Sequence, residues 1–276
     1  MVKIIAVCNQ KGGVGKTAVT VGLAEVMSQR LGQRVLLIDA DPQANATSIL
    51  GVEEPERTLN DVLAGDKETK EVPPGVLAAA ISPSGPSWQP ESDKGAPWTA
   101  IDVVASERNL AAREQDQMLG REHRLRTACE GAVDSYDVVL IDCPPSLGGL
   151  TRTGLIASDR ALVVSEPAIF SVAAADRALR AIDALRRSDA PHLQPLGILV
   201  NRYRERSPEH RYRLEEMTGL FGPLVLRPPL PDRSAVQQSQ GATTPVHRWH
   251  GHGGTELATA FDAHLDRVLR AGATRR

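Results

Sequence analysis

The first seventeen residues contain the feature that most restricts the fold of this 276-residue chain. An apolar run from Ile4 to Val7 is followed by the glycine-rich stretch 9–17, NQKGGVGKT, and then by a helix-like segment. Because glycines have no Cβ, several backbone N–H groups in such a loop can point inward at phosphate oxygens, and the next helix directs its positive N-terminal end at the same place. The order strand, loop, helix therefore predicts a phosphate-binding loop in an α/β fold.

Two lysines occur in this loop, and each is expected to have its own role. We expect Lys16 to neutralise the β- and γ-phosphates of a nucleoside triphosphate, and the Thr17 hydroxyl to ligate Mg²⁺. The usual pattern has a glycine where this chain has Gln10, and Lys11 is an additional cation at the loop entrance. Lys11 is either a solvated loop lysine or a residue that crosses to the nucleotide of a second subunit. The residues expected to bind nucleotide here are Lys11, Gly12, Gly13, Val14, Gly15, Lys16, Thr17 and Ala18.

Carboxylates follow two further apolar segments, 34–38 and 137–141, that read as buried strands. Asp39 and Asp41 follow the first segment, and Asp142 follows the second. In an open parallel sheet the carboxyl ends of the strands form the ligand-binding edge, which places these aspartates beside the phosphate loop. We expect Asp142 to hold Mg²⁺ through water, with Asp39 as a further metal residue, and Asp41 to orient an attacking water. The alternative is that such aspartates are helix caps or turn residues.

The rest of the chain alternates short apolar runs with helical patterns. We expect a short helix near 59–63, a strand at 101–104 and helices at 121–133 and 171–187. This alternation predicts an α/β fold in which a mostly parallel, twisted sheet is covered by helices on both faces. A chain of this length commonly forms one domain, so we expect residues 1–276 to be a single domain. Prolines and glycines between 82 and 97 exclude regular structure there, which predicts an exposed loop or insertion at about 82–99.

Composition restricts the class of protein. The formal net charge is −2, so any contact with nucleic acid must come from a local basic patch. The three cysteines, Cys8, Cys129 and Cys143, lack a C-x-x-C spacing and lie in or near apolar elements, which predicts reduced core residues. The chain enters its first strand without room for a signal peptide, and it contains no apolar run long enough to cross a bilayer. These features predict a cytoplasmic protein without a structural metal site or disulfides.

Three motifs together resemble a known family. KGGVGKT at 11–17, LIDADPQANATS at 37–48 and VVLIDCPPSLGGLT at 138–151 resemble the deviant Walker-type P-loop ATPases of the ParA/MinD superfamily, and the second motif resembles the ParA/Soj branch. The resemblance implies ATP and Mg²⁺ as cofactors and a weak ATPase. It further implies that Lys11 acts across an ATP sandwich homodimer, and that hydrolysis depends on Lys11, Lys16, Asp41 and Asp142. It places three more residues near the adenine: Asn201, Pro228 and Pro229.

An arginine-rich region is the candidate contact for a macromolecule. Residues 176–213 contain nine arginines and five acidic residues, a local net charge of +4. The densest part interleaves tyrosine with arginine, a pattern that fits sequence-independent phosphate binding. Its candidate DNA-binding residues are Arg202, Arg204, Arg206, Arg211 and Arg213. The alternative is a solvated surface on which glutamates neutralise the arginines. The family resemblance implies nonspecific double-stranded DNA as the ligand of the ATP dimer, association with the nucleoid, and a ParB-like centromere-binding or adaptor protein that stimulates release.

Three other functions remain open. A MinD-like membrane-positioning ATPase would carry a basic amphipathic C-terminal helix, and residues 255–270 are amphipathic. The polar side of that helix includes Glu256 and Asp262, whereas membrane-surface helices prefer lysine and arginine, so we expect the helix to dock on the core and no membrane contact. A ParA-like ATPase could instead position a protein cargo. The third possibility is a non-hydrolysing ATP switch, which the presence of Lys11, Asp41 and Asp142 together disfavours.

Overall fold

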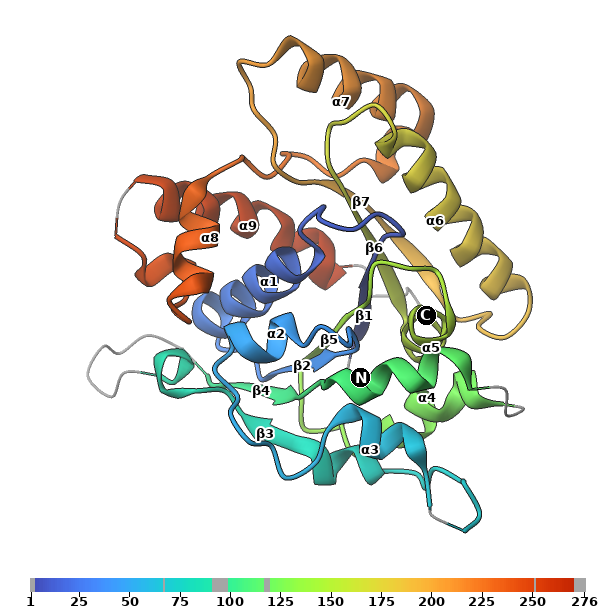
Figure 1. The fold of residues 1–276 in the computed structure, drawn as a ribbon. Coiled ribbons are helices and arrows are strands. Elements are labelled where there is room, and N and C mark those ends of the chain that lie inside the picture. The colour runs from blue at the N-terminus through green and yellow to red at the C-terminus, as the bar shows by residue number, and fades with distance from the viewer. Residues whose placement is uncertain (1–2, 67, 91–98, 117–119, 251, 271–276) are drawn as a thin grey trace.

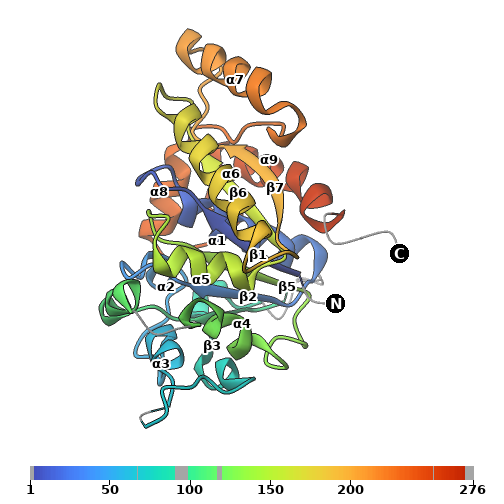
Figure 2. The same cartoon turned by 90° about the vertical axis from the view of Figure 1, so that its right-hand side faces the viewer.

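One seven-stranded sheet forms the centre of the molecule (Figures 1 and 2). The computed structural model describes residues 3–66, 68–90, 99–116, 120–250 and 252–270. The strand order is β3-β4-β2-β5-β1-β6-β7, and all neighbours are parallel except β3 and β4. The strands are β1 (Lys3–Cys8), β2 (Val35–Asp39), β3 (Ile81–Pro83), β4 (Ile101–Val104), β5 (Val138–Asp142), β6 (Arg160–Ser165) and β7 (Gln194–Val200). The predicted mostly parallel sheet is confirmed.

Helices cover both faces of this sheet, as expected. Those that contribute buried side chains to one face are α1 (Lys16–Leu31), α2 (Asn45–Ile49), α8 (Ser234–Gly241) and α9 (His252–Arg270). Those that cover the other face are α3 (Leu59–Ala64), α4 (Arg124–Cys129), α5 (Gly149–Ala157), α6 (Ser171–Arg187) and α7 (Pro208–Phe221). Because the central strands are buried on both faces, they are almost wholly apolar and show no polar alternation.

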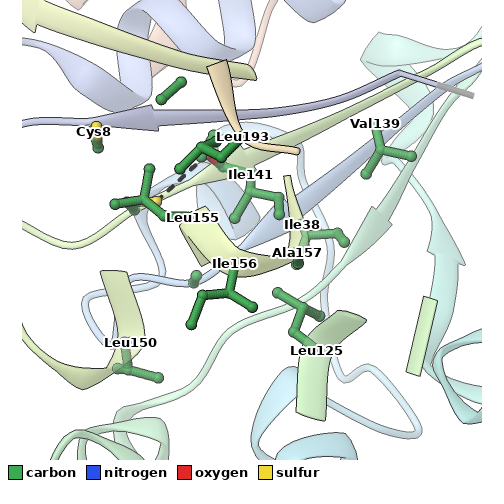
Figure 3. Close-up of a cluster of buried hydrophobic side chains, with 14 of the residues drawn as sticks. Cys8, Ile38, Leu125, Val139, Ile141, Leu150, Leu155, Ile156, Ala157 and Leu193 are labelled. Carbon is green, nitrogen blue, oxygen red and sulfur yellow. Dashed lines mark hydrogen bonds between the residues drawn. The ribbon is translucent and has the colours of Figure 1, made fainter. Parts of the chain in front are cut away.

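The central strand β1 shows how one sequence supplies both cores. Its side chains point alternately to the two faces, so Ile5 and Val7 join the core under α1 and α9, whereas Ala6 and Cys8 join the core under α4 and α5. Figure 3 shows part of this second core, which contains Cys8 together with the α5 residues Leu155 and Ile156. The strand is therefore fixed on both sides, and so is the starting point of the loop that follows it.

The C-terminal helix α9 docks on the core. Four of its apolar side chains are buried: Leu257, Phe261, Leu265 and Val268. The Phe261 ring packs onto the backbone of α1 at Gly22, where an added Cβ would lie 2.4 Å from a ring carbon. The apolar face of α9 is thus covered by the chain's own core, which confirms the expected docking. No helix within the described residues is long and apolar enough to span a bilayer.

Two expectations about local structure were wrong. Regular structure does occur between 82 and 90, since β3 pairs with β4 there and Trp88 is buried with its indole N–H donating to the Ile49 carbonyl at 2.8 Å. Gly85 allows this because an added Cβ would lie 2.6 Å from the Gly51 carbonyl oxygen. Residues 91–98 of the predicted loop lie outside the described part. The helix expected at 121–133 is a short 3₁₀ turn followed by α4, which ends at Cys129 before the left-handed Gly131 (φ +75°).

The cysteines are buried and free, as predicted. Burial raises the pKa of the Cys8 thiol to about 12, and it has the same effect on Cys129. Burial also raises the pKa of Cys143. All three therefore stay protonated near neutral pH and behave as small apolar core residues.

Candidate nucleotide site

The glycine-rich stretch forms a tight loop between β1 and α1. Gly13 and Gly15 have left-handed backbone angles, with φ of +78° and +88°. A Cβ on Gly15 would lie 2.3 Å from the Asn201 Nδ2 atom, which donates to the Val14 carbonyl at 2.9 Å. At its start the loop is held by Asn9, which donates to the Val164 carbonyl of β6 and accepts from the Lys11 N–H. The loop is therefore shaped from both sides, and the N-terminus of α1 opens into it.

Lys16 is a buried cation that forms no ion pair with a carboxylate of the described residues. Its exposed fraction is 6%, and its Nζ donates weakly to the Lys11 carbonyl at 3.5 Å. Burial lowers the pKa of Lys16, and the nearby Asp142 opposes that shift. A buried lysine with so little compensation fits an anion in the adjoining loop, and the β- and γ-phosphates of a nucleotide are anions of that kind.

Asp142 and Thr17 meet at the end of β5. The Thr17 hydroxyl donates to Asp142 Oδ2 at 2.7 Å, and the Thr20 hydroxyl donates to Oδ1 at 3.0 Å. Burial, followed by the charge of Asp39, raises the pKa of Asp142 to about 7. Mg²⁺ is usually bound by one or two protein oxygens together with phosphates and water. The Thr17 hydroxyl and the Asp142 carboxylate supply oxygens of this kind, so this pair fits Mg²⁺.

Asp39 is held in a different way. Its side chain accepts hydrogen bonds from the Thr47 N–H and hydroxyl, both at 2.8 Å, and from the Asp41 N–H at 3.1 Å. Burial raises the pKa of Asp39 to about 6, against the effect of these hydrogen bonds. Because both of its oxygens already fix α2 and the turn before it, Asp39 is less available to a metal than Asp142.

Asp41 lies two residues further on, near the mouth of the site. Its Oδ1 accepts from the Gln43 N–H at 2.9 Å, and the Ser106 hydroxyl holds its backbone carbonyl at 2.7 Å. No hydrogen bond to Oδ2 occurs among the described residues, although the residue is only 7% exposed. A firmly held carboxylate with one oxygen unused suits a role in orienting water.

Lys11 lies on its own subunit. Its Nζ forms an ion pair with Glu166, the residue directly after β6, and the two side chains are 35% and 22% exposed. Neither sequence-based alternative for Lys11 included this contact. Next to it, the Gln10 side chain accepts a hydrogen bond from Arg177 Nε of α6 at 2.7 Å.

The predicted adenine residues lie together at the end of β7. Asn201 follows β7 directly and touches the loop through its amide, as described above. Pro228 and Pro229 belong to a segment that runs alongside, because the next residue, Leu230, donates its N–H to the Val200 carbonyl at 2.8 Å and accepts from the Tyr203 N–H at 2.9 Å. The fold thus brings these three residues to the same edge of the sheet as the phosphate loop.

The five candidate DNA-binding arginines do not form one uniform surface. Arg202 donates to the Gly13 carbonyl at 2.7 Å, so it contacts the phosphate loop. Arg204 is paired with Asp232 at 2.6 Å, and Arg213 is paired with both Glu209 and Glu216. Arg206 is exposed, and the exposed Arg211 contacts the Glu205 carbonyl at 3.3 Å. Among the described residues, Arg202, Arg206 and Arg211 of this set are exposed without an ion pair to a carboxylate, and Arg202 is engaged with the phosphate loop.

Sequence reasoning missed Glu166, Arg177 and Thr20. For Glu166 a signal was present, since it follows an apolar strand directly, as Asp39 and Asp142 do. Thr20 lies one helical turn after Lys16 and so shares its face of α1. Arg177 had no local signal, because its contact with Gln10 joins residues 167 positions apart.

Comparison with known proteins gives consistent relatives. The model of the AAA domain family matches residues 2–195. The chromosome partitioning protein ParA of Caulobacter vibrioides is 33% identical over 250 residues, which cover 88% of this chain and 86% of that protein. The sporulation initiation inhibitor protein Soj of Bacillus subtilis is 30% identical over 250 residues, which cover 89% of this chain and 90% of Soj.

Solved structures show the same fold over the full length. A cobyrinic acid a,c-diamide synthase from Mycobacterium smegmatis, with bound ADP and magnesium, matches with a TM-score of 0.77 and 29% identity, covering 100% of this chain and 97% of that one. A McdA–ATP complex from Cyanothece matches in fold with a TM-score of 0.79 at 22% identity, covering 100% of this chain and 98% of that one. With its phosphate loop, its strand-end aspartates and these relatives, the chain belongs to the AAA domain family and, within it, to the ParA/Soj family of P-loop partition ATPases.

Proposed function

We propose that this chain is a partition ATPase that dimerises on ATP, binds nonspecific DNA as the dimer, and releases it when a ParB-like partner stimulates hydrolysis. The cargo in this proposal is plasmid or chromosome DNA. The observation that carries it is the arrangement at one sheet edge: a buried, unmatched Lys16 beside the Thr17–Asp142 pair, with a second lysine at the loop entrance.

Each residue of the site has a role in the proposed reaction. The loop N–H groups and Lys16 bind the phosphates, and Thr17 and Asp142 hold Mg²⁺, directly or through water. When bound, Mg²⁺ would draw negative charge from the β- and γ-phosphate oxygens. Asp41 orients the attacking water, because its carboxylate accepts a hydrogen bond from that water. Turnover by the single subunit is slow in this proposal because Lys11, engaged with Glu166, is not yet at a nucleotide.

Arg206 and Arg211 are the strongest candidates for DNA contact. Both lie at or near the start of α7, which is far from the α3 end of the molecule in Figures 1 and 2. Phosphate neutralisation by exposed arginines gives sequence-independent affinity. A dimer carries two copies of each arginine, so the affinity for DNA depends steeply on dimerisation.

A membrane-positioning role has less support. It needs a free apolar helix face, whereas four apolar side chains of α9, those of Leu257, Phe261, Leu265 and Val268, are buried. The Phe261 ring packs on α1 at Gly22.

DNA binding in three nucleotide states tests the proposal. We expect binding of random-sequence duplex DNA with ATP or a slowly hydrolysed analogue plus Mg²⁺, and little binding with ADP. Lys11→Ala should keep measurable ATP binding but lose ATP-dependent DNA binding, whereas Lys70→Ala, the same change at an exposed loop lysine, should behave as wild type. Equal DNA binding with ATP and ADP would contradict the nucleotide switch. A normal ATP dimer of Lys11→Ala would exclude a role for Lys11 across the interface.

A further inference from the structure

The segment after β6 is built to hold the entrance of the phosphate loop. Glu166 is fixed at a tight corner, where its carbonyl accepts from the Ala168 N–H at 2.9 Å, and β6 itself is tied to the loop by Asn9. From this corner the Glu166 carboxylate forms its ion pair with Lys11. About two-thirds or more of each side chain is shielded from solvent, so salt screens this pair less than a fully exposed one.

A second contact joins the same two regions. Arg177 of α6 donates to the Gln10 side chain at 2.7 Å. Gln10 and Lys11 are the two residues by which this loop departs from the usual phosphate-loop pattern, and both are held by the β6–α6 segment. The segment also exposes two large apolar side chains, Ile169 at 61% and Phe170 at 71%. The loop entrance, the carboxylate and this apolar surface therefore lie together.

We propose that Glu166 retains Lys11 within its own subunit and so sets the protein concentration at which the ATP-bound chain dimerises. This inference rests on the proposed function, in which Lys11 crosses to the nucleotide of the second copy. Lys11 has one ammonium group and must leave Glu166 before it can reach a second subunit. A bound triphosphate offers several negative oxygens in place of one carboxylate, so the exchange is favourable only when nucleotide is present on the partner.

The size of the effect follows from the number of ion pairs. An ion pair of this exposure contributes a factor of about two to five to an equilibrium. Each dimer breaks two such pairs, one in each copy, and the two factors multiply. Removing the Glu166 charge should therefore tighten dimerisation about tenfold.

Glu166→Gln tests the proposal, with Asp176→Asn as the matched control. Both changes remove one carboxylate from the β6–α6 region, but Asp176 is paired with Arg180 and not with the loop. Sedimentation at saturating Mg²⁺ and a slowly hydrolysed ATP analogue should show half-dimerisation of Glu166→Gln at about one-tenth of the wild-type concentration, with Asp176→Asn unchanged. If wild type dimerises and Glu166→Gln matches the control or dimerises more weakly, the role of Glu166 is overturned while the proposed function stands. If wild type stays monomeric, the proposed function fails with it.

Zero-length cross-linking tests the contact itself in the wild-type chain. A carbodiimide joins an amine to a carboxylate in direct contact, with loss of water. In an equal mixture of ¹⁴N- and ¹⁵N-labelled protein without nucleotide, we expect a Lys11–Glu166 cross-linked peptide whose two halves carry the same label. Its yield should fall several-fold with Mg²⁺ and the ATP analogue. Absence of the cross-link without nucleotide, or an unchanged yield with the analogue, would overturn the proposal.

Discussion

The phosphate loop and the arginine-rich segment are both dense in positive charge, but they differ in the burial and ion pairing of that charge. At the loop, Lys16 is buried and lacks an ion pair with any described carboxylate. In the segment, Arg213 forms ion pairs with both Glu209 and Glu216, and Arg204 has Asp232. A buried charge without compensation is costly unless a ligand supplies the counter-charge, whereas an exposed pair costs almost nothing. Unmatched burial therefore locates a ligand site better than charge density does.

The same contrast divides the arginine segment itself. Arg202 counts toward the basic density in the sequence, but its guanidinium lies on the Gly13 carbonyl of the phosphate loop. Arg202 therefore lies at the candidate nucleotide site and not on the surface that the other arginines form. The surface left for a polyanion is smaller than the sequence indicated, and it is centred on Arg206 and Arg211.

The largest expected effect is at Lys16. Lys16→Ala should weaken ATP binding by about 100-fold or more, because loss of one partner from a buried charged contact costs on the order of 3 kcal/mol. Titration calorimetry with ATP and Mg²⁺ measures this. Arg206→Ala, the same loss of charge at the exposed segment, should leave ATP affinity within about twofold of wild type. Similar losses in both variants would break the distinction between buried and exposed charge.

The next effect is on DNA binding. Arg206→Ala/Arg211→Ala should weaken ATP-dependent DNA binding about tenfold and make its salt dependence shallower, because each dimer loses up to four phosphate contacts. Arg57→Ala/Arg108→Ala carries the same charge change near the α3 end of the molecule and should have little effect. Fluorescence anisotropy over a range of salt concentrations measures both variants. An equal loss in the two would show that net charge matters and not this surface.

The smallest effect concerns Asp142 and the stability of the nucleotide-free chain. Burial raises the pKa of this carboxyl from 3.8 to about 7, so ionisation is easier in the unfolded state and stability falls as pH rises through that window. Asp142→Asn removes the penalty but weakens the hydrogen bonds that Thr17 and Thr20 donate to this side chain, which offsets most of the gain. The apo protein should therefore be more stable at pH 8 by about 1 kcal/mol, with a smaller gain at pH 5.

Urea unfolding in EDTA at the two pH values measures that gain. The same variant should lose ATP hydrolysis, because it lacks the charge that would hold Mg²⁺ in the proposed site. A less stable variant at pH 8 would contradict the inference that the ionised Asp142 carboxylate destabilises the nucleotide-free chain.

Much of the fold could be predicted because its signals are local. The helix at 171–187 and the strand at 101–104 were expected with the observed bounds, since apolar periodicity records burial directly. The segment 82–90 was not, because its order comes from a distant partner: Trp88 is fixed by the Ile49 carbonyl, and β3 by β4. Proline and glycine report local backbone preference, and here tertiary pairing overrides it.

The candidate site divides in the same way. Lys16, Thr17 and Asp142 were found because a loop motif and a strand end fix their positions, and the structure brings Thr17 and Asp142 to 2.7 Å. The contacts of Lys11 with Glu166 and of Gln10 with Arg177 span 155 and 167 residues. No spacing rule covers such pairs, so they emerge only when β6 is placed beside β1.

The most direct test of the account is the mass of the purified chain in solution with and without Mg²⁺ and a slowly hydrolysed ATP analogue. We predict the monomer mass of 29.7 kDa without nucleotide or with ADP, and twice that value at saturating analogue. A mass that stays at 29.7 kDa at saturating analogue and high protein concentration would contradict the claim that triphosphate at this loop joins two copies.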